Sequence, residues 1–216
     1  MDFIFMLTKD DQTVEDCLEL YEAILAVGLT HVGFKDVGVD KATQKSLTDA
    51  INSSGAISYM EVVSTTDEDA IASAKTAVEL GVQRLLGGTQ VEEIMEIVKG
   101  TDTTYFPFPG FPVGRPTELG GSEADVEGHC RDFMRIGCAG CDILAYRGTE
   151  ADPVALVRAA RRGLGSGYLI VAGSVDSVER ISAIADAGAD AFTIGTAIFN
   201  GSYAPRKGAI QSQLKA

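Results

Sequence analysis

The sequence lacks a long hydrophobic run, and basic residues are few. No apolar segment approaches the roughly 20 residues that a membrane-spanning helix needs. The apolar start Met1–Thr8 carries no basic n-region, so we expect a first strand rather than a signal peptide. Only 18 Lys and Arg residues stand against 31 Asp and Glu, giving a formal net charge of −13. Nucleic acids and anionic membranes are bound through basic patches, so this composition argues against both as partners.

Cysteine and histidine are also scarce, which bears on disulfides and metals. The four cysteines are Cys17, Cys130, Cys138 and Cys141. They occur without secretory context, so we expect reduced thiols in a cytoplasmic protein. Cys138 and Cys141 form a C-x-x-C motif with no second pair for zinc, and we interpret it as incidental. His31 and His129 are far apart and lack metal-ligand spacing, so we predict no metal site.

Short apolar runs alternate with amphipathic stretches along the whole chain, and no low-complexity segment or Pro/Ser linker interrupts them. The predicted strands are Phe3–Thr8, His31–Asp36, Ile57–Val63, Gln83–Gly87, Thr103–Phe108, Cys141–Tyr146, Tyr168–Gly173 and Ala191–Gly195. The predicted helices are Val14–Val27, Lys41–Ser53, Asp67–Leu80, Val91–Val98, Ala124–Ile136, Pro153–Leu164 and Val178–Ala187. Eight such repeats predict an α/β fold, a (β/α)8 or TIM barrel that forms one domain over residues 1–216.

Local signals at the helix ends agree with this arrangement. The glycines that fall just past predicted helices are Gly28, Gly55, Gly81, Gly137 and Gly188, where a left-handed residue ends a helix. Asp152 and Pro153 fit an N-cap followed by proline at the first helical position. The segment Pro109–Gly121 is too long for a routine strand-to-helix turn. It is either a lid or a rigid proline-braced loop, and its Arg115 is either a mobile cation or a solvated surface arginine.

The last two predicted strands carry the clearest binding signal. The runs Tyr168–Val175 and Asp190–Phe199 both end in small residues and open into a helical stretch. A strand that stops at glycine before a helix exposes backbone N–H groups, which bind anions and above all phosphate. In TIM barrels the seventh and eighth strands frequently form such a phosphate site. We therefore predict a small phosphorylated ligand.

A lysine and a glutamate are predicted to meet at the barrel mouth. Alternation along His31–Asp36 places Lys35 at the top of the barrel interior, where an unpaired charge is costly. The neighbouring strand Ile57–Val63 places Glu61 near its end. The two form either a catalytic pair, with Glu61 moving protons and Lys35 binding a carbonyl, or a structural ion pair. Asp36 has the opposite parity and is expected to cap the following turn, although a site role stays open.

The sixth predicted strand ends in two further candidates, Tyr146 and Arg147. Arg147 is suited to grip a carboxylate or phosphate oxygen, and Tyr146 to act as a general acid or a positioning hydroxyl. We expect one of them to face the site and the other the helices. Asp142 and Arg84 lie at strand beginnings, where barrel residues serve stability, so we discount both. Thr89, just beyond the fourth strand, is a weak ligand candidate.

These motifs resemble those of the ribulose-phosphate-binding barrels. That group of phosphate-binding TIM barrels includes hexulose-6-phosphate synthase, 3-keto-gulonate-6-phosphate decarboxylase, phosphosugar epimerases and the histidine and tryptophan biosynthetic barrels. Val171–Val178 is similar to the family's seventh-strand phosphate turn, and Gly188–Phe199 to its eighth-strand counterpart. The resemblance implies that the phosphate is held, largely through backbone N–H groups, by Gly173, Ser174, Gly195 and Thr196.

The second strand departs from that family. The decarboxylase and synthase group carries Asp-x-Lys-x-x-Asp, whereas Gly33 stands here at the position of the first aspartate and Lys35 is kept. The spacing to the next acid differs as well. The catalytic positions match no member of the family that we know, so we expect a branch of its own.

We therefore expect an enzyme that acts on a small phosphorylated carbonyl or sugar compound. The expected reaction is isomerisation, epimerisation or carbon–carbon bond cleavage of aldolase type, with Lys35, Glu61, Tyr146 and Arg147 as catalytic residues. No cofactor is expected, although a divalent cation at Asp36 or Glu61 stays open. The alternatives are an FMN-binding oxidoreductase barrel and a non-catalytic phosphometabolite-binding barrel. Barrels of this size often associate, so a homodimer is among the expected assemblies.

Overall fold

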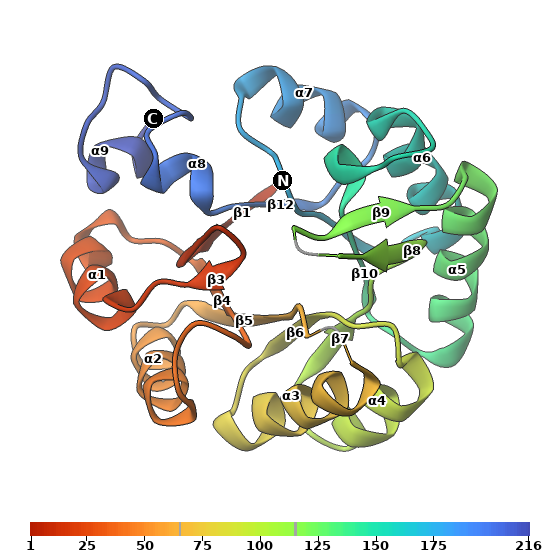
Figure 1. Ribbon diagram of the computed structural model, residues 1–216, viewed down its shortest axis with the longest axis horizontal. Coiled ribbons are helices and arrows are strands. Elements are labelled where there is room, and N and C mark those ends of the chain that lie inside the picture. The colour runs from red at the N-terminus through yellow and green to blue at the C-terminus, as the bar shows by residue number, and fades with distance from the viewer. Residues whose placement is uncertain (65, 115) are drawn as a thin grey trace.

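The computed structural model describes residues 1–64, 66–114 and 116–216, and its centre is a ring of eight parallel strands (Figure 1). The strands are β1 Asp2–Met6, β4 His31–Lys35, β5 Ile57–Val62, β6 Arg84–Gly87, β7 Thr104–Phe106, β10 Gly140–Ile143, β11 Tyr168–Val171 and β12 Ala191–Ile194. Their order is β10-β11-β12-β1-β4-β5-β6-β7. Backbone N–H groups of Ala139 and Asp142 donate to the carbonyls of Tyr105 and Pro107, which nearly closes the ring between β7 and β10. The predicted TIM barrel is confirmed.

Helices follow the strands and surround the ring (Figure 1). They are α1 Cys17–Ile24, α2 Lys41–Ser53, α3 Asp67–Leu80, α4 Val91–Val98, α5 Glu123–Ile136, α6 Pro153–Leu164, α7 Val178–Asp186, α8 Thr196–Phe199 and α9 Ile210–Leu214. Side-chain caps fix several starts. Asp152 accepts from the N–H of Ala155 at 2.9 Å with Pro153 at the first position, and Ser122 and Asp125 form a capping box. None of the helices in the described part of the chain is long and apolar enough to cross a membrane.

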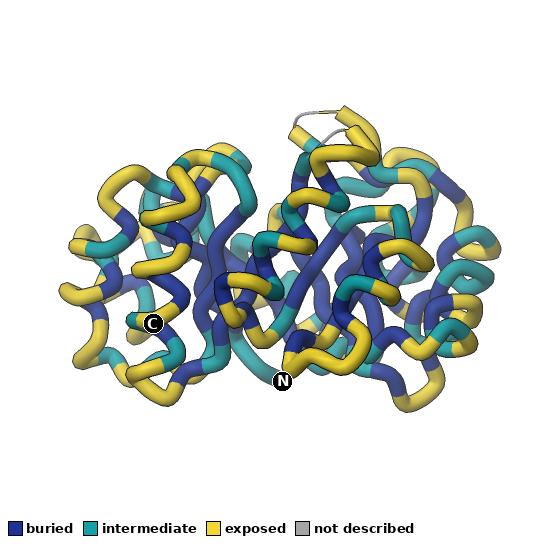
Figure 2. Tube along the Cα trace, turned by 90° about the horizontal axis from the view of Figure 1, so that it is seen from below, coloured by how far each residue is buried: buried dark blue, intermediate teal, exposed yellow. Residues whose placement is uncertain are grey.

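Alternation along the strands divides the buried residues into two sets. Side chains such as Phe5, Phe34 and Leu85 point outward and pack against the helices. A second, smaller cluster that includes Ile4 and Tyr59 fills the barrel interior. Figure 2 shows the buried strands running through the middle of the molecule. Each fully buried large side chain contributes about 1.5–3 kcal/mol relative to an exposed one, so these two layers fix the barrel on which the site is built.

Two short hairpins lie at the C-terminal end of the barrel, between strands and helices (Figure 1). The first pairs β2 Thr8–Lys9 with β3 Gln12–Thr13 through a two-residue turn. Its turn residues Asp10 and Asp11 have φ values of 51° and 60°, the left-handed conformation that such hairpin turns require. The second pairs β8 Phe111–Val113 with β9 Glu118–Gly120. It occupies the long segment predicted as a lid or a rigid loop, and Arg115 lies outside the described residues.

A cluster of rings and one guanidinium fills the opposite, N-terminal end of the barrel. The Arg84 guanidinium lies 4.9 Å from the ring centre of Tyr168 and 5.3 Å from that of Tyr59. Its Nη1 donates to the Tyr59 hydroxyl at 2.7 Å, and His31 Nδ1 is 2.8 Å from the same hydroxyl. Burial lowers the pKa of His31, although the nearby Asp2 carboxylate opposes that shift. Arg84 and His31 therefore lie far from the strand ends where barrel sites form.

Candidate functional site

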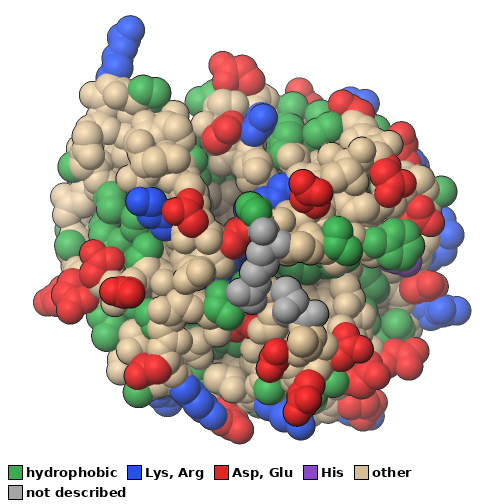
Figure 3. Space-filling model, viewed as in Figure 1, with side chains coloured by type: hydrophobic (Ala, Val, Ile, Leu, Met, Phe, Trp, Pro, Cys, Tyr) green, Lys and Arg blue, Asp and Glu red, His purple; other side chains and the backbone are tan. Residues whose placement is uncertain are grey.

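A cavity of about 880 Å³ opens at the C-terminal ends of the strands. Figure 3 views the molecule from this end, where acidic and basic side chains surround a hollow near the centre. The cavity is lined by all eight residues that the sequence predicts as catalytic or phosphate-binding: Lys35, Glu61, Tyr146, Arg147, Gly173, Ser174, Gly195 and Thr196. The barrel thus brings them to one place, and their geometry decides what each can do.

Lys35 and Glu61 lie side by side on β4 and β5, in register with each other. Lys35 Nζ is 3.5 Å from Glu61 Oε2, and only 6% of the Lys35 side chain and 5% of the Glu61 side chain are exposed. The backbone of Lys35 is held on its other side by Thr13, whose hydroxyl accepts from the Lys35 N–H at 2.9 Å and donates to its carbonyl at 2.8 Å. The lysine is therefore fixed at the cavity floor with a carboxylate beside it.

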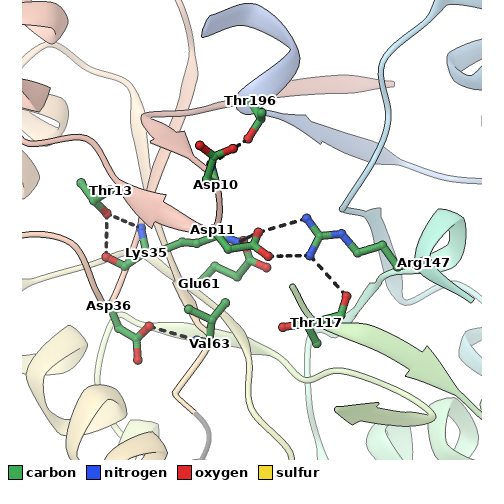
Figure 4. A network of polar contacts seen from close by, with 10 residues as sticks. All are labelled: Asp10, Asp11, Thr13, Lys35, Asp36, Glu61, Val63, Thr117, Arg147 and Thr196. Atoms are coloured by element: carbon green, nitrogen blue, oxygen red, sulfur yellow. Dashed lines mark hydrogen bonds and ion pairs between the residues drawn. The ribbon is translucent and has the colours of Figure 1, made fainter. Parts of the chain in front are cut away.

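Asp11, which the sequence analysis did not single out, connects the two basic residues of the site (Figure 4). Its Oδ1 lies 2.7 Å from Lys35 Nζ, and its two oxygens accept from Arg147 at 2.8 and 3.0 Å. Burial alone would raise the pKa of Asp11, but the hydrogen bonds from Arg147 and the charge of Lys35 outweigh it and hold that pKa well below its usual range. Asp11 is therefore an ionised bridge between Lys35 and Arg147.

A signal for this residue is present in the sequence. Two aspartates stand between Thr8–Lys9 and Gln12–Thr13, and aspartate is one of the residues that tolerate the left-handed conformation. Two-residue strands are too short to show periodicity, so only the turn chemistry could have indicated the hairpin. The hairpin directs Asp11 over the barrel mouth, toward Lys35 and Arg147 (Figure 4).

Tyr146 and Arg147 lie in a turn after the sixth barrel strand, and not at the strand end where the sequence predicted them. The strand β10 ends at Ile143, and Ala145–Arg147 form a single 3₁₀ turn. Strand parity does not apply in such a turn, and both residues line the cavity instead of only one. Arg147 also donates to the Thr117 carbonyl beside the β8–β9 hairpin at 3.3 Å. The Tyr146 ring lies 4.6 Å under the Arg180 guanidinium, and burial raises the pKa of its hydroxyl.

The two glycine turns are shaped by close backbone approach. Gly173 has a φ of 73°, and a Cβ added there would lie 2.7 Å from Arg147 Nε. A Cβ on Gly195 would lie 2.7 Å from the Thr8 carbonyl oxygen, so neither position has room for a larger residue. The Thr196 hydroxyl accepts from the Asp10 N–H at 3.1 Å, which joins this turn to the first hairpin (Figure 4). Both turns therefore border the cavity beside Arg147 and the Asp10–Asp11 turn.

Asp142, discounted in the sequence as a strand beginning, lies deep in the barrel. The strand starts at Gly140, and the side chain of Asp142 is fully buried. Neither of its carboxyl oxygens has a hydrogen-bond partner among the described residues. Burial first, and the charge of Glu61 second, raise the pKa of Asp142 well above its usual value, while Lys35 and Arg147 oppose the shift. The early assignment to the stability end was therefore wrong, because the predicted strand began one residue late and extended too far.

The remaining candidates lie outside this cavity. Asp36 accepts hydrogen bonds from the Val63 N–H at 3.0 Å and from the hydroxyls of Ser64 and Ser73, so its carboxyl joins the end of β4 to the segment after β5 and to α3 instead of capping the turn that follows β4. Thr89 lines a second cavity of about 270 Å³ beneath the β8–β9 hairpin. Within residues 1–64, 66–114 and 116–216, no group of three or more His, Cys, Asp or Glu side chains is placed to hold a metal ion.

Comparisons with known proteins show similarity in fold and do not identify a reaction. The sequence matches no protein-family model and no curated protein. Among solved structures, the chain is similar to a protein from Coccidioides immitis assigned as a deoxyribose-phosphate aldolase, with 10% identity and a TM-score of 0.69. That match covers 95% of this chain and 84% of the other.

Two further structures show the range of proteins built on this fold. Native KDPGal is similar over 100% of this chain and 97% of its own, with 14% identity and a TM-score of 0.66. A mandelate oxidase mutant, solved with an FMN adduct, is similar over 99% of this chain and 70% of its own, with 11% identity and a TM-score of 0.66. At these identities the likeness concerns the fold, which is that of the TIM barrels that the sequence motifs resemble.

Proposed function

We propose that this protein is an enzyme that acts on a small phosphorylated carbonyl compound and cleaves or forms a carbon–carbon bond in the manner of an aldolase. The observation that carries the proposal is the buried Lys35–Glu61 pair, in one cavity with the glycine turns at Gly173 and Gly195. Isomerisation or epimerisation of the same kind of compound is the alternative reaction, since both begin with proton transfer beside a carbonyl.

The phosphate is assigned to the turns at Gly173–Ser174 and Gly195–Thr196. A Cβ on Gly173 would meet the Arg147 side chain and one on Gly195 would meet the Thr8 carbonyl oxygen, so only glycine fits at the first position of each turn, and both turns line the cavity. In a chain with a net charge of −13, an anionic ligand has to find its attraction locally. N–H groups at such turns and the Arg147 guanidinium supply it. Binding energy from the phosphate can then serve the chemical step at the other end of the ligand.

Lys35 is assigned to the carbonyl, and we propose that it holds the carbonyl covalently. Its side chain is almost fully buried and Glu61 lies 3.5 Å away, so the carboxylate can take the proton that the ammonium must lose before it attacks. The amine then forms a bond to the carbonyl carbon. The former carbonyl oxygen takes one proton from the attacking nitrogen and the proton held by Glu61, and leaves as water, which gives a protonated imine and restores the Glu61 carboxylate. In the cleavage direction Glu61 takes a hydroxyl proton, the carbon–carbon bond breaks, and its electron pair moves toward the imine nitrogen. Arg147 and Tyr146 orient the rest of the ligand.

A Lys35→Met variant tests this assignment. We expect turnover of a panel of phosphorylated ketoses and aldehydes to fall to background, because the thioether can neither attack nor polarise a carbonyl. Binding of inorganic phosphate, measured by calorimetry, should stay within about twofold of the unmodified protein. Turnover that survives in the variant would overturn the role of Lys35. Saturable ligand binding without turnover in either protein would favour the non-catalytic barrel.

The FMN reading has one specific support, the similarity in fold to the mandelate oxidase described above. The same two glycine turns would take the FMN phosphate, and Lys35 would lie in the same cavity as the flavin. Purified protein that is yellow, and that loses this colour when Gly173→Ala removes the space beside Arg147, would favour the oxidoreductase over the aldolase-type enzyme.

A further inference from the structure

The charged groups that line the cavity floor, together with Asp142 buried in the barrel interior, include more acids than bases. Two cations, Lys35 and Arg147, stand near three carboxyl groups, those of Asp11, Glu61 and Asp142. If all three carboxyls were ionised, the cluster would carry an unbalanced negative charge inside the barrel. Burying an unpaired charge is so costly that a group changes its protonation state instead. One proton is therefore retained among the three carboxyls at neutral pH.

The surroundings of each carboxyl show where this proton resides. Asp11 receives three donor contacts from Lys35 and Arg147, which stabilise its ionised form. Glu61 lies beside the Lys35 ammonium and reaches the cavity. Asp142 is fully buried and has no donor to either oxygen among the described residues. The proton therefore belongs on Asp142.

The charged groups around Asp142 come from three other elements. Glu61 on β5 acts on it as a like charge, whereas Lys35 on β4 and Arg147 in the 3₁₀ turn act as opposite charges. On its own strand it is flanked by Cys141, a fully buried thiol whose pKa is raised, first by burial. The thiol is neutral, so the balance is set by one carboxylate and two cations. Burial is the largest cause of the raised pKa of Asp142, the charge of Glu61 adds to it, and the two cations oppose it.

We propose that Asp142, fully buried and without a donor to either oxygen, is a neutral carboxylic acid and a positioning residue, so that it adds no second negative charge near Glu61, which acts as the base of the site. The use of this base rests on the function proposed above. When Glu61 takes a proton from the ligand, an O–H bond of the ligand breaks, an O–H bond forms on Glu61, and the electron pair stays with the ligand. Asp142 keeps its own proton throughout, and Glu61 later returns the proton that it took.

Infrared spectroscopy of the ligand-free protein across a pH series tests the pair. A neutral carboxylic acid has a C=O stretching band that a carboxylate lacks. We expect this band at neutral pH in the unmodified protein, and its loss in Asp142→Asn. In Glu61→Gln the repulsion by Glu61 is gone, so the band should disappear at a pH about one unit or more lower. Asp36→Asn is the matched control, since Asp36 accepts three hydrogen bonds as a carboxylate, and it should leave the band unchanged.

Each other outcome overturns a stated part of the inference. A band that is absent at neutral pH, or that survives Asp142→Asn, shows that Asp142 does not hold the proton. If the band disappears at the same pH in Glu61→Gln as in the unmodified protein, the buried acid is not coupled to Glu61. If Asp142→Asn does not fold, ¹³C labelling of the aspartate carboxyls gives the same reading by NMR in the unmodified protein. None of these measurements depends on turnover. The inference about Asp142 can therefore fail while the proposed function holds, and the proposed function can fail while the inference about Asp142 holds.

Discussion

At the scale of single residues, Asp11 determines how the basic groups of the site are arranged. It is the only carboxylate, among the residues that the structure describes, that contacts both Lys35 and Arg147 directly. It comes from a turn in which both residues have positive φ, in a hairpin that is joined to β4 because the Thr13 hydroxyl bonds to both the N–H and the carbonyl of Lys35. Lys35 and Arg147 are therefore kept apart and oriented by a group outside the barrel wall.

Asp11→Asn should lower the free energy of unfolding by about 1–3 kcal/mol, because two cations lose their shared counterion while the hydrogen-bonding shape is kept. The pKa of Asp11 is lower in the folded protein, so its contribution is present above the unfolded value of 3.8 and is lost as the pH falls below it. Denaturant titration at neutral pH and at acidic pH measures both effects. The difference between variant and unmodified protein should shrink in acid.

Asp10→Asn is the control for this variant. Asp10 occupies the same turn, also with positive φ, but it is exposed, and Thr196 accepts a hydrogen bond from its backbone N–H rather than contacting its side chain. We expect its substitution to change stability by less than about 0.5 kcal/mol. Equal losses in the two variants would show that the turn, and not the bridge between Lys35 and Arg147, is what matters.

At the scale of elements, the sequence predicted most helices and strands because their signals are local and repeated. The bounds of α2, α3, α4 and α6 agree with the predicted ones residue for residue. The sixth barrel strand, β10, does not agree with its predicted bounds. The apolar pattern continues through Leu144 and Ala145, whereas the backbone turns after Ile143. Periodicity reports burial, and a buried 3₁₀ turn gives the same pattern as a strand end. For that reason Arg147 was identified as a candidate while Asp142 was misplaced.

The β8–β9 hairpin offers a prediction at this scale. A Cβ on Gly110 would lie 2.8 Å from the Gly120 carbonyl oxygen and 2.7 Å from the Leu119 side chain, so Gly110→Ala should force the hairpin away from its seat. Gly114 has nearly the same φ, 77° against 78°, but the nearest atom that its Cβ would meet among the described residues is the Pro116 carbonyl oxygen, 3.6 Å away. Thermal unfolding should show Gly110→Ala to be about 1–3 kcal/mol less stable than Gly114→Ala. Equal stabilities would contradict the tight seating of the hairpin.

At the scale of the whole molecule, the barrel has one end that opens into a cavity and an opposite, sealed end that side chains fill. The cavity with Lys35 and Glu61 opens at the C-terminal ends of the strands, whereas the Arg84 cluster fills the N-terminal end. This division follows from the alternation of strand residues, and it could be predicted because it needs only the strand order and parity. The hydrogen-bond pairings over the barrel mouth leave no local pattern in the sequence, since Asp11 and Arg147, for example, are 136 positions apart.

His31, at the sealed end of the barrel, leads us to expect that global stability depends on pH. The pKa of His31 is lower in the folded protein than the ordinary value of 6.5, mainly through burial. The unfolded chain therefore binds a proton more readily, and the contribution of His31 is present above 6.5 and declines as the pH falls below it. His31→Gln should flatten that part of the stability curve, measured by denaturant titration, and leave phosphate binding unchanged. A variant with the same slope as the unmodified protein would show that His31 is not the group responsible.

Mass spectrometry after borohydride reduction tests the central claim most directly. The protein is mixed with a panel of phosphorylated ketoses and aldehydes, reduced, digested and mapped for modified lysines. We predict a stable adduct on Lys35, absent in Lys35→Met and suppressed by inorganic phosphate, whose mass identifies the ligand. An adduct confined to exposed lysines such as Lys41 and Lys45, or none with any compound, would contradict the covalent role of Lys35 at the barrel mouth.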